Sequence, residues 1–147
     1  MENTDNAKIM IADSSGLVSL AVNADDLHSL AVAEARRLKQ ASILVVVPAD
    51  VFSETVNILG KLSGHADSYA TARELLAPGL FVHVETSDAL RDAALEMFRD
   101  KPGSVSYTDC VVMTFAEHYE TKNIFGFDDH FRKAGYQLPT KEEATSR

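Results

Sequence analysis

The stretch IMIADSSGLVSL, residues 9–20, places a charged side chain directly after four apolar residues. The run from Ile9 to Ala12 is typical of a short strand that is buried on both faces. Asp13 follows at once, although an unpaired carboxylate is costly to bury. A cation from elsewhere in the fold, either a distant side chain or a metal ion, is therefore expected beside this strand end.

The rest of the chain alternates between strand and helix patterns. Further strands are expected over 43–47, where the β-branched run ILVVV stands, over 80–84 and over 123–127. Helices are expected from residue 14, over 26–40, 50–63, 66–76, 90–98 and 106–120, and as a turn after 127. This order predicts an α/β fold of three layers, α/β/α, with a mainly parallel central sheet.

Length and composition predict one domain in the cytoplasm. A chain of 147 residues can bury a substantial core, and we expect that domain over 8–138, between a disordered segment 1–7 and a polar tail 139–147. No apolar run approaches the roughly 20 residues of a membrane-spanning helix, and the N-terminus lacks a secretory pattern. The single cysteine, Cys110, cannot form an internal disulfide. No membrane partner is expected.

Four acidic residues stand where predicted strands pass into predicted helices. They are Asp13, Glu54, Asp109 and Asp128. Because the carboxyl ends of parallel strands lie along one edge of a sheet, the four side chains can converge there. Carboxylate oxygens without cysteine ligands favour Mg²⁺ or Mn²⁺ over Zn²⁺. Without metal, mutual repulsion should raise the pKa of at least one of these carboxyl groups.

Helix capping is the alternative explanation for each acid taken singly. Asp13 can cap a helix that begins at Ser14, and SYTD, residues 106–109, matches the capping-box pattern with Asp109 at its last position. Capping does not explain why Asp13 should end a core strand, or why Asp109 should begin an otherwise apolar helix. A shared divalent cation explains both positions.

The strings ADSSGLVSL, ETVNIL, SYTDC and IFGFDDHF together resemble the PIN-domain ribonucleases, most closely the VapC-type toxins of toxin–antitoxin pairs. The resemblance covers residues 8–138. It implies an endoribonuclease whose Mg²⁺ or Mn²⁺ ions are held by Asp13, Glu54, Asp109 and Asp128, which are its catalytic residues. It also implies an RNA substrate, a small antitoxin partner and a homodimer. Candidate partner surfaces are the apolar stripe 27–38 and the region around Leu59 and Leu62.

Two residues near the first acids are candidates for supporting roles. Ser15 matches a hydroxyl position of the resemblance, where it would orient Asp13 or a metal-associated water, although it can equally cap the helix. Asn57 lies three residues after Glu54 on the same helix face and could contact such a water or the RNA backbone. An ordinary surface role for Asn57 is the competing interpretation.

The segment around the last acid departs from the family pattern at one position. Gly126 stands where a Thr or Ser is frequent in the family, two residues before Asp128. Asp129 is the next candidate ligand, and His130 is interpreted as an exposed helix histidine rather than a catalytic group. The basic pair Arg132 and Lys133 is a weak candidate for RNA contact because it lies close in sequence to the site. The net charge of −8 argues against nonspecific coating of nucleic acid.

Two other functions remain open from the sequence. The first is a small-molecule phosphohydrolase or a phosphoacceptor domain that uses Asp13 as nucleophile. The usual hydrolase pattern of that kind has a second Asp two residues later, where this chain has Ser15. The second is a non-catalytic PIN-like interaction module, which would have no need for four clustered negative charges.

Overall fold

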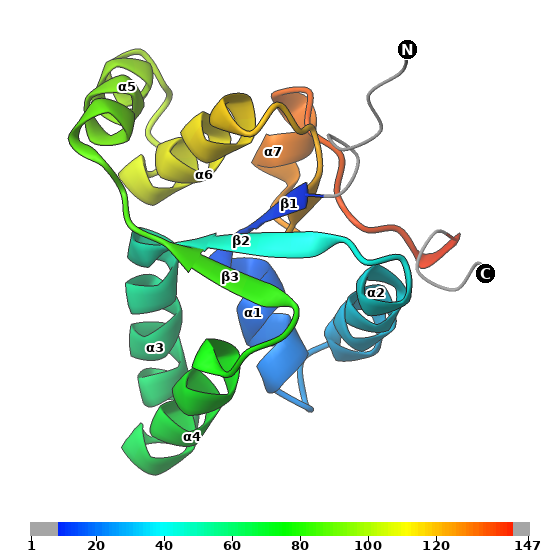
Figure 1. Ribbon diagram of the computed structural model, residues 1–147. Helices are drawn as coiled ribbons and strands as arrows, with labels where there is room; N and C mark the ends of the chain where they lie inside the picture. Colours follow the sequence, from blue (N-terminus) through cyan, green and yellow to red (C-terminus); the bar gives the residue numbers. More distant parts are fainter. Residues whose placement is uncertain (1–8, 143–147) are drawn as a thin grey trace.

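Strand β1 (Ile9–Ala12) lies inside a four-stranded parallel sheet (Figure 1). The computed structural model describes residues 9–142. β1 pairs on one side with β2 (Leu44–Pro48) and on the other with β4 (Ile124–Phe125), while β3 (Phe81–Val84) pairs with β2. The strand order is therefore β3-β2-β1-β4. Val45 and Val47 on one face of β2 and Val46 on the other are all buried, as expected for a strand covered on both faces.

Helices cover both faces of the sheet, and the predicted three-layer α/β fold is confirmed (Figure 1). One layer contains α1 (Ser14–Ala21), α2 (His28–Gln40), α3 (Ala49–Ser63) and α4 (His65–Leu76). The other contains α5 (Asp88–Arg99), α6 (Tyr107–His118) and α7 (Asp129–Lys133). Helix α6 is buried from Asp109 to Ala116, which agrees with its almost uninterrupted apolar sequence.

Several element boundaries differ from the sequence prediction. β4 is only two residues long, and α2 begins at His28 rather than at residue 26. The start of α2 is set by Asp25, whose Oδ1 accepts a hydrogen bond from the Leu27 N–H at 2.8 Å. Leu27 is consequently outside the helix and 39% exposed. The prediction that it belongs to the apolar stripe of this helix is therefore wrong.

The buried face of α2 contains a carboxylate that the prediction omitted. Glu34 is 1% exposed, although Ala31 and Leu38 on the same face are buried as expected. The Arg37 guanidinium donates two hydrogen bonds of 2.9 Å to the two oxygens of Glu34. This bidentate pairing satisfies the buried charge locally.

The expected terminal segments are only partly described. The predicted disordered segment 1–7 lies outside the described residues, as do residues 143–147 of the predicted polar tail. Within residues 139–142, Pro139 is buried. None of the helices in the described part of the chain is long and apolar enough to cross a lipid bilayer.

The strand order places a topological switch point between β1 and β4. From β1 the chain proceeds outward to β2 and β3, and it then crosses to the opposite side of β1 to form β4. Ligands of open parallel α/β sheets bind beyond the carboxyl ends of the strands at such a point. Asp13 follows β1 and Asp128 follows β4 by three residues, so two of the predicted acids flank the switch point.

Close contact between α1 and β4 depends on Gly16. A Cβ atom at this position would lie 2.2 Å from the carbonyl oxygen of Phe125 and 2.7 Å from its carbonyl carbon. Both obstacles are backbone atoms that also belong to the sheet, since the Asp13 N–H donates to the same carbonyl oxygen at 3.0 Å. Only glycine allows α1 to start this close to β4.

The substitution Gly16→Ala should therefore lower the free energy of unfolding by about 3 kcal/mol or more, because backbone must shift to admit the methyl group. Gly60→Ala is the matched control. Gly60 is also helical, and its Cβ would meet only the His65 ring edge at 3.4 Å, so this change should be neutral or slightly stabilising. Urea denaturation measures both. Equal stability of the two variants would contradict the packing argument.

Candidate metal centre at the switch point

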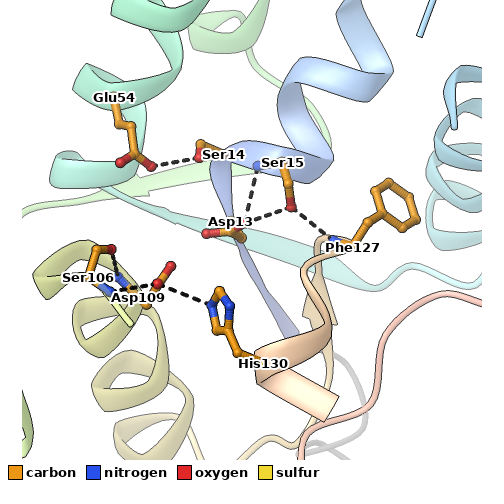
Figure 2. Close-up of polar contacts among 8 residues, drawn as sticks. All are labelled: Asp13, Ser14, Ser15, Glu54, Ser106, Asp109, Phe127 and His130. Atoms are coloured by element: carbon orange, nitrogen blue, oxygen red, sulfur yellow. Dashed lines mark hydrogen bonds and ion pairs between the residues drawn. The ribbon is translucent and has the colours of Figure 1, made fainter. Parts of the chain in front are cut away.

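Asp13 joins β1 to α1 and is the most deeply buried acid of the site. Its backbone is extended, it is the N-cap of α1, and only 1% of the residue is exposed. Its Oδ2 accepts hydrogen bonds from the Ser15 N–H at 3.1 Å and from the Ser15 hydroxyl at 2.7 Å (Figure 2). The capping role expected from the sequence is thus present, and Ser15 orients the carboxylate.

Ser15 also connects Asp13 to the segment that follows β4. Its Oγ accepts a hydrogen bond of 2.9 Å from the Phe127 N–H (Figure 2). One hydroxyl group therefore donates to the carboxylate after β1 and accepts from the backbone after β4. This arrangement fixes the two strand ends relative to each other.

Gly126 is required by the same contact. A Cβ atom at this position would lie 2.8 Å from Asp13 Cβ and 3.2 Å from Ser15 Oγ. A Thr or Ser at position 126 would therefore force Asp13 or the neighbouring backbone to shift in this structure. The hydroxyl group that donates to the Asp13 carboxylate in this structure belongs to Ser15.

The charge of Asp13 is not balanced by a basic side chain. The pKa of Asp13 is raised to about 6, chiefly by burial; the Ser15 hydrogen bonds lower it, and the charges of Asp128 and Asp109 add to the increase. Repulsion between the acids therefore contributes, as predicted, but burial is the larger cause. Within residues 9–142, no Lys or Arg forms an ion pair with Asp13.

Glu54 reaches the site from α3 and is held by α1. It lies in the second turn of α3, the helix that follows β2, and it is half-buried. Its Oε1 accepts a hydrogen bond of 2.6 Å from the Ser14 hydroxyl (Figure 2). The two consecutive serines at the start of α1 thus hold two different acids, Ser14 for Glu54 and Ser15 for Asp13. The contact of Ser14 with Glu54 was not predicted from the sequence.

Asp109 is buried at the start of α6, where it completes the predicted capping box. The Ser106 N–H donates to Asp109 Oδ2 at 2.8 Å, and the Asp109 N–H donates to Ser106 Oγ at 3.0 Å. The residue is 8% exposed. Capping and a site role are compatible here, because the cap fixes the carboxylate at the carboxyl edge of the sheet (Figure 2).

Asp109, Asp128 and His130 form a cluster with the dimensions of a metal site. Each offers one ligand atom, and the three atoms lie within 4.8 Å of one another. Asp128 is exposed and makes no capping hydrogen bond although it is the N-cap of α7. His130 Nε2 lies 3.1 Å from Asp109 Oδ2. The interpretation of His130 as an exposed histidine is therefore wrong, since 24% of its side chain is exposed and it faces the acids.

Asp13 and Glu54 are not part of this three-residue cluster, and the remaining candidates also lie outside it. Asn57 is exposed and lines a groove between α3 and α4. Asp129 is exposed and forms ion pairs with Arg132 at 3.0 Å and with Lys133 at 3.7 Å. The basic pair is thus engaged with Asp129 on the surface of α7, and Asp128 rather than Asp129 joins the cluster.

Comparison with known proteins agrees with the observed architecture. A search of curated proteins found no match. The crystal structure of VapC20 from Mycobacterium tuberculosis, a toxin that cleaves the sarcin-ricin loop, has a similar fold with a TM-score of 0.74 and 23% sequence identity. The alignment covers 88% of this chain and 96% of the VapC20 chain. The PIN domain model matches residues 10–136, and the protein therefore belongs to the PIN domain family.

Proposed function

We propose that this protein is a metal-dependent endoribonuclease and the toxin of a toxin–antitoxin pair. The observation that carries the proposal is the meeting of Asp13, Asp109 and Asp128 at the switch point, where the buried Asp13 has no basic partner among the described residues. Membership of the PIN domain family and the fold shared with VapC20 support the same function. VapC20 cleaves the sarcin-ricin loop, and we propose structured RNA as the class of substrate to test.

The donor set fits a hard divalent cation. It is dominated by carboxylate oxygens at the carboxyl edge of the sheet, and one of the acids, Asp13, is buried and forms no ion pair with a Lys or Arg of residues 9–142. Mg²⁺ and Mn²⁺ favour such oxygen ligands. We propose that Asp13, Asp109 and Asp128 hold the ion, with Glu54 at the margin of the site. A bound ion would supply positive charge to the scissile phosphate and a nucleophile at neutral pH.

The protein's own contribution is to hold these acids in place before substrate binds. Ser15 fixes Asp13, Ser14 fixes Glu54, and the N-terminal turn of α6 fixes Asp109. Such preorganisation reduces the rearrangement needed when charge develops in the transition state. A phosphoacceptor role for Asp13 is less consistent with its environment, since a carboxylate that is 1% exposed is poorly placed to attack a substrate.

The first prediction concerns activity. The protein should cleave structured RNA internally in Mg²⁺ or Mn²⁺ and lose this activity in EDTA. Asp109→Asn should reduce the rate by about 100-fold or more, because a neutral amide holds the cation and its charge less well. Gel analysis of RNA fragments measures the rate, and calorimetry measures metal affinity.

Asp88→Asn is the control for this experiment. Asp88 also stands in the first turn of a helix, but 92% of its side chain is exposed and it pairs with Arg91. Its loss should leave the rate unchanged. Cleavage that persists in EDTA would contradict the proposed metal dependence. Equal metal affinity of the wild type and Asp109→Asn would contradict the assignment of Asp109 as a ligand.

The second prediction concerns the stability of the metal-free protein. A pKa of about 6 in the folded state, against 3.8 in the unfolded chain, means that ionised Asp13 destabilises the fold. The penalty is absent below pH 3.8, grows between pH 3.8 and pH 6, and reaches about 3 kcal/mol above pH 6. Asp13→Asn should therefore raise the free energy of unfolding at pH 8 in EDTA by up to about 3 kcal/mol, and far less at pH 4.

Urea denaturation at the two pH values tests this expectation. Asp26→Asn, at an exposed position, should change the free energy of unfolding by less than about 0.5 kcal/mol at both. In EDTA at pH 8 the Asp13→Asn protein should have the larger free energy of unfolding. Saturating Mn²⁺ should reverse this order, because the cation should stabilise the wild type more than Asp13→Asn. An Asp13→Asn protein that is destabilised equally at pH 4 and pH 8 would contradict the account.

The third prediction concerns partners. We propose a homodimer that binds a small antitoxin, and the exposed apolar side chains of α3 and α4 are the candidate surface. Leu62 is 61% exposed and Tyr69 is 68% exposed, whereas Leu59, named with Leu62 in the sequence analysis, is buried at 2% exposure. Replacing Leu62 and Tyr69 together by Asp should weaken association by about tenfold or more, because charge would replace apolar contact area.

Light scattering of the purified protein, alone and with the product of its neighbouring gene, measures this association. Leu95→Asp is the matched control, since Leu95 is 48% exposed but lies on α5 in the opposite layer. It should leave association intact. Two unassociated monomers, or equal damage from Leu95→Asp, would contradict the proposed surface.

A further inference from the structure

We infer that His130 Nε2 is a ligand of the divalent cation held by Asp109 and Asp128, and that this nitrogen gives the site a preference for Mn²⁺ over Mg²⁺. The inference rests on the metal dependence proposed above and adds to it a ligand and a metal selectivity. It starts from the His130 imidazole, which lies beside Asp109 at the switch point (Figure 2).

The spacing of the atoms is that of ligands on a single ion. At metal–ligand distances of about 2.1 Å, adjacent ligands of an octahedral ion lie about 3 Å apart and opposite ones about 4 Å apart. His130 Nε2 and Asp109 Oδ2 are separated by 3.1 Å, which suits adjacent ligands. All three ligand atoms of the cluster lie within 4.8 Å of one another, so small side-chain rotations bring Asp128 to the same ion.

The imidazole nitrogen has no other partner in the described part of the chain. His130 Nε2 is buried and makes no hydrogen bond, because the short approach to Asp109 Oδ2 lacks hydrogen-bond geometry. A buried polar atom of this kind is costly to leave unsatisfied. The Asp109 oxygen already accepts from the Ser106 N–H at 2.8 Å. A cation among the three side chains would satisfy the nitrogen and both carboxylates at once.

The ligand set determines the choice of metal. Mg²⁺ prefers oxygen ligands and retains several waters, whereas imidazole suits transition metals. Mn²⁺ shares the octahedral oxygen chemistry of Mg²⁺ but accepts a nitrogen more readily. A site in which one imidazole joins the carboxylates should consequently bind Mn²⁺ more tightly than Mg²⁺, and the difference should depend on His130.

Calorimetric titration of the full chain with MnCl₂ and with MgCl₂ tests the selectivity. His130→Asn should weaken Mn²⁺ binding by about tenfold or more and leave Mg²⁺ binding nearly unchanged. His118→Asn is the matched control, because His118 is an exposed histidine at the opposite end of α6 from Asp109. The control should bind both metals as the wild type does.

Electron spin-echo spectroscopy of the wild type, labelled with ¹⁵N-histidine and loaded with Mn²⁺, tests the ligand directly. We expect nitrogen modulation in the wild type and in His118→Asn, and its loss in His130→Asn. Wild-type protein that binds Mn²⁺ without nitrogen modulation would overturn the inference. Equal weakening of Mn²⁺ and Mg²⁺ in His130→Asn would also overturn it, because His130 would then only position Asp109. A wild type that binds neither metal would instead overturn the proposed function.

Discussion

The buried carboxylate of Asp13 accepts two hydrogen bonds from Ser15 but forms no ion pair with a Lys or Arg of the described residues. Its burial beside β4 requires two glycines, since any side chain at Gly16 or Gly126 would strike the neighbouring backbone or Asp13 itself. The same closeness lets the Ser15 hydroxyl join the ends of β1 and β4. The fold thus accepts an electrostatic cost at the switch point, where parallel α/β sheets bind their ligands. A divalent cation bound here would stabilise the ionised carboxylate, and the same negative charge would favour binding of the cation.

Sequence reasoning predicted the architecture because the strong signals were local. The β-branched run before Pro48 and the apolar stretch after Asp109 each indicate a buried element with little ambiguity. Once strands alternate with helices, the rule for parallel sheets places every strand end on one edge. The prediction that Asp13, Glu54, Asp109 and Asp128 converge rested on that rule together with the family resemblance, and the capping box at Ser106 followed from its four-residue pattern.

Other features could not be predicted because they depend on tertiary contacts or on a different backbone periodicity. His130 stands two residues after Asp128, a spacing that separates side chains on a helix but brings them to one side of an extended segment. Asp128 is the extended N-cap of α7 whereas His130 already lies inside the helix, so neither spacing rule alone predicts that the two side chains meet. The burial of Glu34 could have been predicted, because it lies four residues from both Leu30 and Leu38 on the inward face of α2. Arg37 follows three residues later, at the spacing of an ion pair on a helix. The need for glycine at position 126 could not be predicted, because it depends on where the fold places Asp13.

The central claim is that the acids at the switch point are arranged around a cation. Anomalous X-ray diffraction from crystals grown with Mn²⁺ tests it most directly, because the manganese signal locates the ion independently of any assumed ligand. The account predicts an anomalous peak bounded by the carboxylates of Asp13, Asp109 and Asp128. Absence of a peak there at saturating Mn²⁺, or a lysine or arginine side chain paired with Asp13 in its place, would contradict it.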